Sequence, residues 1–221
     1  MSGDTDGVLI MEAVLETHPV TDFTLWPVAE KHTGGLPPLS GDLPPLQVGT
    51  AMAVLACYNT RPRERGAGRP ENGVELLQQL TSAESVIAPG GLRLRDTSTG
   101  VTVSPGCCCG LEDWRDWLDL LDGSGPWLGH DPSPGLEFSD SLVRLWPDAQ
   151  RVAPGPPIEL PSADLPALLA SVRADLTAFL DLVEQWTTPW VPAPLTARLL
   201  AKLDACLAVT APLGDRDSTA G

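Results

Sequence analysis

Apolar residues recur at helical spacing over the last quarter of the chain, and this pattern predicts two helices. The first covers 165–183, with Ser162 as a good N-cap. Its apolar positions are Leu165, Leu168, Leu169, Val172, Leu176, Phe179, Leu180 and Val183. After a break at 188–192, Pro194 suits the first turn of a second helix, whose apolar face carries Leu195, Leu199, Leu203 and Leu207. The pattern predicts a C-terminal αα-hairpin with Phe179 on its core face.

Alternation of apolar and polar residues predicts two β-hairpins. Residues 92–95 and 101–103 alternate on either side of a turn at 96–100, and residues 136–146 alternate around the pair Ser139-Asp140. Residues 158–160 add an edge strand.

Shorter apolar runs occupy the first third of the chain. Residues 8–16 fit a buried strand or a helix equally well, whereas the aromatic segment 23–28 favours β structure. The run 51–58 is too apolar to be exposed, so it belongs in the core with Cys57 inside. The prolines in 34–48 remove backbone donors, which predicts a loop rather than a helix.

Asn72 is suited to cap a helix through Val74, Leu77 and Leu80.

The stretch 105–131 gathers three of the five cysteines, three of the seven tryptophans and one of the three histidines. Cys107 to Cys109 are expected to continue a strand. Leu111, Trp114, Leu118 and Leu121 then recur at helical spacing, and a further strand is expected to start at Trp127. The pattern predicts a β-turn-α-β crossing with its cysteines, Trp114 and Trp127 in the core.

Together these elements predict an α+β fold, with a mainly antiparallel sheet built from hairpins, packed against helices and completed by the C-terminal αα-hairpin. With 221 residues, 43% of them hydrophobic, the chain can bury one core. We expect residues 1–213 to form a single domain and residues 214–221 to be a disordered tail.

Charge and composition exclude several classes of function. The formal net charge is −15, which argues against binding to nucleic acid or to anionic membranes, since both require a basic face. A basic leader and an apolar run of membrane-spanning length are both missing, which predicts a cytoplasmic protein. Five cysteines, three of them consecutive, predict reduced thiols rather than a disulfide framework. The excess of Arg over Lys, with much Ala, Gly and Pro, is typical of GC-rich coding sequences such as those of actinobacteria.

The candidate metal-binding or catalytic residues are Cys107, Cys108, Cys109 and His130, because thiolate and imidazole are preferred zinc ligands. On a strand, Cys107 and Cys109 would share a face and Cys108 would not. Paired CxxC knuckles are missing, so buried thiols packed on Trp114 are favoured over a metal site made of Cys107, Cys109 and His130.

A reactive cysteine is the other alternative. Cys109 precedes a predicted helix, whose N-terminal dipole could lower the thiol pKa, and His130 with Asp131 or Asp113 could serve as base and orienting acid. The chain contains no GxGxxG, P-loop, GxSxG or HExxH motif, so the common nucleotide-binding and hydrolase classes have no support.

Two charged groups remain as binding candidates. The acids Glu112, Asp113, Asp116 and Asp119 cluster at a helix start, where they either face solvent or form an acidic binding face together with Asp131. An arginine cluster lies among prolines and glycines and consists of Arg61, Arg63, Arg65 and Arg69. This segment is either a solvated linker or a binding site for an anionic group.

The segments WLGHDPSPGLEFSDSLVRLWPD (127–148) and PIELPSADLPALLASVRADLTAFL (157–180) resemble the closing pattern of the SUKH superfamily of bacterial immunity proteins. Trp146-Pro147-Asp148 and Ala178-Phe179-Leu180 stand at the positions of its aromatic-Xaa-Asp and helical motifs. The resemblance covers about 125–185, and the first half with PGCCCGLEDW departs from the pattern. It implies an α+β domain without catalysis that neutralises a toxin or binds another protein through an acidic groove.

The sequence therefore favours a non-catalytic domain that needs no cofactor and binds a basic protein. The alternative is an enzyme that depends on cysteine or a metal and uses Cys107 to Cys109 with His130.

Overall fold

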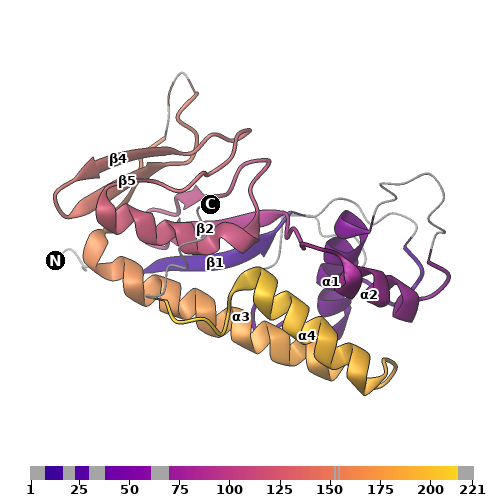
Figure 1. The fold of residues 1–221 in the computed structure, drawn as a ribbon. Helices are drawn as coiled ribbons and strands as arrows, with labels where there is room; N and C mark the ends of the chain where they lie inside the picture. Colours follow the sequence, from indigo (N-terminus) through magenta and orange to yellow (C-terminus); the bar gives the residue numbers. More distant parts are fainter. Residues whose placement is uncertain are drawn as a thin grey trace.

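The computed structural model describes residues 8–16, 23–29, 38–60, 70–151, 153 and 155–213, and Figure 1 shows their fold. In chain order the elements are β1 (Leu9–Leu15), α1 (Pro45–Asn59), α2 (Gly73–Ser82), β2 (Gly90–Asp96), β3 (Thr102–Val103), η1 (Leu111–Asp122), β4 (Gly135–Ser139), β5 (Leu142–Trp146), β6 (Ile158–Pro161), η2 (Ser162–Asp164), α3 (Leu165–Thr187) and α4 (Ala193–Leu207). The predicted arginine cluster and the predicted disordered tail lie outside the described residues.

Within the described residues, two small antiparallel sheets, each of three strands, form the β part of the fold. In the order β1-β2-β3, the central strand β2 pairs with β1 from Leu9 opposite Asp96 to Leu15 opposite Gly90. In the order β4-β5-β6, the central strand is β5. Both predicted hairpins and the strand at 158–160 are confirmed, and the segment 8–16 proves to contain a strand. The fold is α+β.

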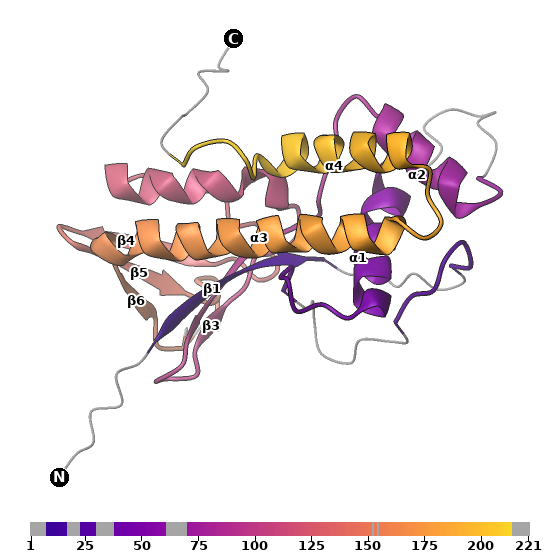
Figure 2. The same cartoon turned by 90° about the horizontal axis from the view of Figure 1, so that it is seen from below.

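Helices α3 and α4 form the predicted αα-hairpin. Figure 2 shows α3 crossing β1, with α4 alongside α3 and with α1 and α2 gathered at one end. The inward faces carry the residues that the helical period selects, among them Leu169, Val172, Leu176, Phe179, Val183, Leu195, Leu199, Leu203 and Leu207. Asn72 caps α2 by accepting the amide hydrogen of Glu75, with an N···O distance of 2.9 Å. Cys57 is half-buried against the core.

Two helix starts differ from the prediction. Helix α1 begins at Pro45, within the segment expected to be a loop, because a proline in the first turn lacks only an N–H that the helix would leave unpaired. Ser162 does not cap α3: it begins the short 3₁₀ turn η2, and no side chain caps α3.

The aromatic segment 23–28 does not form the expected β structure. The indole N–H of Trp26 donates to the carbonyl of Gly49 at 2.8 Å, and its ring packs edge-on against Trp186, with 5.4 Å between centroids. The tertiary contacts of the buried Trp26 side chain therefore hold this segment in a non-β conformation.

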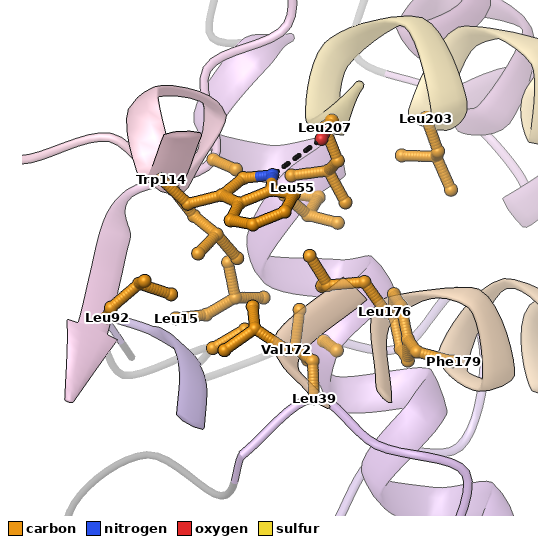
Figure 3. Packing of buried hydrophobic residues seen from close by; sticks show 14 of the residues in the cluster. Leu15, Leu39, Leu55, Leu92, Trp114, Val172, Leu176, Phe179, Leu203 and Leu207 are labelled. Atoms are coloured by element: carbon orange, nitrogen blue, oxygen red, sulfur yellow. Dashed lines mark hydrogen bonds between the residues drawn. The ribbon is translucent and has the colours of Figure 1, made fainter. Parts of the chain in front are cut away.

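Trp114 ties η1 to the end of α4. Its indole N–H donates to the carbonyl of Leu207 at 2.7 Å, as the dashed line in Figure 3 shows. Leu207 is the last residue of α4, where carbonyls lack helical partners, so this bond satisfies an otherwise unpaired acceptor. The predicted burial of Trp114 is confirmed, since its exposed fraction is 1%.

Among the helices of the described ranges, none combines the length and apolarity that crossing a bilayer requires.

Candidate functional site

Helix η1 is a 3₁₀ helix of 12 residues, and its sequence repeats every three residues as LED-WRD-WLD-LLD. A 3₁₀ helix has 3.0 residues per turn, so residues three apart lie directly above one another. The first position of each triplet is buried: Leu111, Trp114, Trp117 and Leu120. The face predicted at the α-helical period is therefore wrong after Trp114, because Leu118 is half-buried and Leu121 is exposed.

The third position of each triplet forms an acidic stripe along η1. It consists of Asp113, Asp116, Asp119 and Asp122. Asp113 and Asp116 are exposed, as predicted for acids of this stretch. Although its side chain reaches solvent, nearby protein atoms reduce the hydration of the Asp116 carboxylate. This desolvation, and then the charges of Asp113 and Asp119, raise the pKa of Asp116. The triplet repeat is the sequence signal that reveals this stripe.

Glu112 differs from its predicted exposed position. It is half-buried, and its carboxylate accepts the amide hydrogen of Ala88 at 2.8 Å. Burial raises the pKa of this carboxyl group. Glu112 therefore connects η1 to the segment before β2 instead of contributing to an acidic surface.

Trp127 is exposed, which contradicts the prediction that it is buried at the start of a strand. Its exposed fraction is 68%, and within the described residues no strand begins there. It lines a small pocket of about 40 Å³ together with Asp113, Asp116 and Trp117 of η1. Ligand pockets usually measure about 300–1,000 Å³, so this one suits a single side chain rather than a metabolite.

The exposure of Trp127 can be tested by fluorescence quenching. Because Asp113 and Asp116 line the same pocket, we expect caesium ions to quench Trp127 more efficiently than iodide does when each ion is normalised to its quenching of free indole. A Trp127→Phe variant should lose most of the caesium-quenchable emission, and a Trp117→Phe variant, at a buried position, should retain it. Equal normalised quenching of Trp127 by both ions at low salt would contradict its place beside the acids.

The first two cysteines lie in a tight turn rather than a strand. Cys107 pairs with His130 through two backbone hydrogen bonds, with N···O distances of 2.6 and 3.2 Å. Cys108 follows with a φ of 67°, a left-handed conformation that reverses the chain. The expectation that all three thiols lie in the core is wrong: Cys108 is exposed, and Cys107 and Cys109 are half-buried.

The turn brings together Cys107, Cys108 and His130. One potential ligand atom from each lies within 4.8 Å of the other two, and the two sulfur atoms are 3.4 Å apart. The hydrogen bond between the Cys107 and Cys108 thiols is the largest of the effects that raise the pKa of Cys107. The Nδ1 atom of His130 lies 3.3 Å from a carboxylate oxygen of Asp131. Asp131 thus belongs to this cluster rather than to the acidic stripe.

Cys109 is separate from this cluster, although the sequence paired it with Cys107. Its sulfur lies 3.7 Å from the carbonyl oxygen of Trp127. Burial is the main cause that raises the pKa of Cys109, to about 11, whereas the prediction for a reactive cysteine was a lowered pKa. Cys109 therefore lacks the thiolate character of an activated nucleophile at neutral pH.

Comparisons of the chain with protein-family models, with curated proteins and with solved structures found no match.

Proposed function

We propose that this chain is a non-catalytic protein-binding module that docks a basic partner on the acidic stripe and Trp127. The observation that carries the proposal is the 68% exposure of a tryptophan that shares a pocket with Asp113 and Asp116. Tryptophan is enriched among the residues that contribute most to protein interfaces, and exposing one to water is unfavourable unless something covers it.

The chemistry of the pocket favours a cationic side chain as the group that it receives. An arginine or lysine entering between Asp113 and Asp116 would offset the repulsion from Asp113, which adds to the desolvation that raises the pKa of Asp116. The same cation would lie against the indole of Trp127, where a cation–π contact contributes about 0.5–2 kcal/mol. The overall charge of −15 would attract such a partner over a longer range.

The resemblance to SUKH immunity proteins gives the proposal a specific form, in which the partner is a toxin that the protein neutralises in the cytoplasm. Of the residues that carry the resemblance, Trp146 ends the β4–β5 hairpin, and Ala178, Phe179 and Leu180 lie in helix α3. The five cysteines are free thiols, which suits a reducing compartment. These observations support the proposal, and the identity of the partner is its direct test.

The test compares two binding variants with a charge-matched control. Proteins from the native host are captured on the wild type, on Trp127→Ala and on the double variant Asp113→Lys/Asp116→Lys. Each captured protein is then purified, and its rates of association and dissociation are measured. The control is Asp181→Lys/Glu184→Lys, which changes the net charge equally at exposed positions of α3.

We expect Trp127→Ala to weaken binding of the partner by about 2 kcal/mol or more, which is about 30-fold in Kd. The Asp113→Lys/Asp116→Lys variant should associate at least about tenfold more slowly at low salt, and this difference should shrink as salt increases. A partner that binds both variants as it binds the wild type and the control would refute this docking surface.

A further inference from the structure

We propose that Cys107, Cys108 and His130 form a zinc-binding site. Two sulfur atoms and one imidazole nitrogen lie within 4.8 Å of one another, with Cys108 and His130 exposed and Cys107 half-buried. Thiolate and imidazole are the side chains that Zn²⁺ prefers, and three protein ligands leave a fourth tetrahedral position for water. This proposal does not depend on the function proposed above, because none of the three residues belongs to the acidic stripe.

Two glycines allow the chain segments that carry the three ligands to approach closely. A Cβ atom on Gly106 would lie 2.2 Å from the carbonyl oxygen of Pro132, and one on Gly129 would lie 2.6 Å from the carbonyl oxygen of Cys107. Gly129 also has a φ of 83°, which favours glycine. The segment before η1 and the segment after Trp127 therefore meet backbone to backbone, and the hydrogen bonds between Cys107 and His130 fix their register.

The spacing of the two sulfur atoms is close to that required by a bound ion. A Zn–S length of about 2.3 Å and tetrahedral angles place two thiolates about 3.8 Å apart. The observed separation of the Cys107 and Cys108 sulfur atoms is 3.4 Å. A small change in side-chain torsions would therefore seat both sulfur atoms on one ion, and the left-handed conformation of Cys108 is what brings these adjacent side chains together.

Asp131 supplies the outer partner that ligating histidines commonly have. Its carboxylate lies 3.3 Å from Nδ1 of His130, and a carboxylate there stabilises the tautomer that carries its proton on Nδ1. The lone pair of the other nitrogen is then available to a metal. When Zn²⁺ binds, each thiol gives up its proton to solvent, so the two thiolates balance the charge of the ion.

The site can be tested by titrating the reduced, metal-free full-length chain with Co²⁺ and then displacing the Co²⁺ with Zn²⁺. We expect one equivalent of Co²⁺ to give thiolate-to-cobalt charge-transfer absorption and the visible bands of tetrahedral coordination, which Zn²⁺ then removes. Cys108→Ser and His130→Ala should each weaken Co²⁺ binding by at least tenfold. The matched control is Cys109→Ser, which removes the neighbouring thiol outside the cluster and should leave the spectrum and affinity unchanged.

Asp131→Asn should weaken Co²⁺ binding by about 10–100-fold while retaining the charge-transfer band, because it changes the orientation of His130 rather than the ligand set. The proposal is overturned if the reduced wild type binds no Co²⁺, or if Cys109→Ser reduces binding as much as Cys108→Ser does. Binding that survives the loss of both Cys108 and His130 would equally overturn it, since the ion would then be held elsewhere.

Discussion

Replacing Phe179 with alanine is expected to lower the free energy of unfolding by about 3–5 kcal/mol, the usual cost of removing a buried phenylalanine. The ring is completely buried in the middle of α3. Figure 3 shows it with Val172 and Leu176, which enter the core from the same helix. Loss of the ring removes apolar area from the core and leaves a cavity that rigid neighbours fill only in part. Urea unfolding followed by circular dichroism would measure the change.

Asp181→Ala provides the matched control for Phe179→Ala. Asp181 lies two residues further along α3 with an exposed side chain, and its replacement should change stability by less than about 0.5 kcal/mol. Similar unfolding midpoints for the two variants would show that Phe179 does not occupy the core.

The elements that the sequence predicts well are those whose side-chain period matches one buried face. Helices α3 and α4 keep the 3.6-residue period over several turns, and burial alternates along 92–95 of β2 and along β5. Strand β4 is the exception, because Phe138 is exposed. In these elements a single repeat determines which side chains are buried. Local sequence is then sufficient to identify the element and its inward face.

The sequence predicts the position of helix η1 correctly, but the inward face that it predicts is wrong after Trp114. The α-helical period selects Leu118 and Leu121, whereas the actual repeat of three selects Trp117 and Leu120. Long 3₁₀ helices are uncommon, since their hydrogen-bond geometry is poorer, so the α-helical period is the natural assumption. The triplet repeat of LED-WRD-WLD-LLD identifies both the buried row and the acidic stripe.

The conformation of the turn at Cys107 and Cys108, and the exposure of Trp127, depend on contacts between distant parts of the chain. The local sequence does not predict these contacts. Cys108 adopts a positive φ, which non-glycine residues seldom do, so no local preference points to a turn there. The partner of Cys107 is His130, and their pairing requires the close approach at Gly106 and Gly129. The residue type of Trp127 favours the core, whereas its side chain is exposed beside η1 in the fold.

A single methyl group at Gly90 is expected to disrupt the first sheet. Gly90 has a φ of 144°, a conformation that is essentially restricted to glycine. A Cβ atom there would lie 2.0 Å from the carbonyl oxygen of Val14 and 2.8 Å from the Cα atom of Leu15, both in the backbone of β1. Backbone strain of about 1–3 kcal/mol and overpacking of about 1–3 kcal/mol should together make Gly90→Ala less stable by about 2–6 kcal/mol.

Gly100→Ala separates the effect of this clash from that of a positive φ alone. Gly100 has a φ of 73°, but a Cβ atom there would meet no atom within 4 Å. Its replacement should therefore cost only about 1–2 kcal/mol, the penalty of the left-handed conformation. Urea unfolding of both variants gives the comparison, and Gly90→Ala should also lose amide protection in β1, because that strand must move to accommodate the methyl group. Equal losses of stability in the two variants would mean that β1 does not approach Gly90 as closely as this register requires.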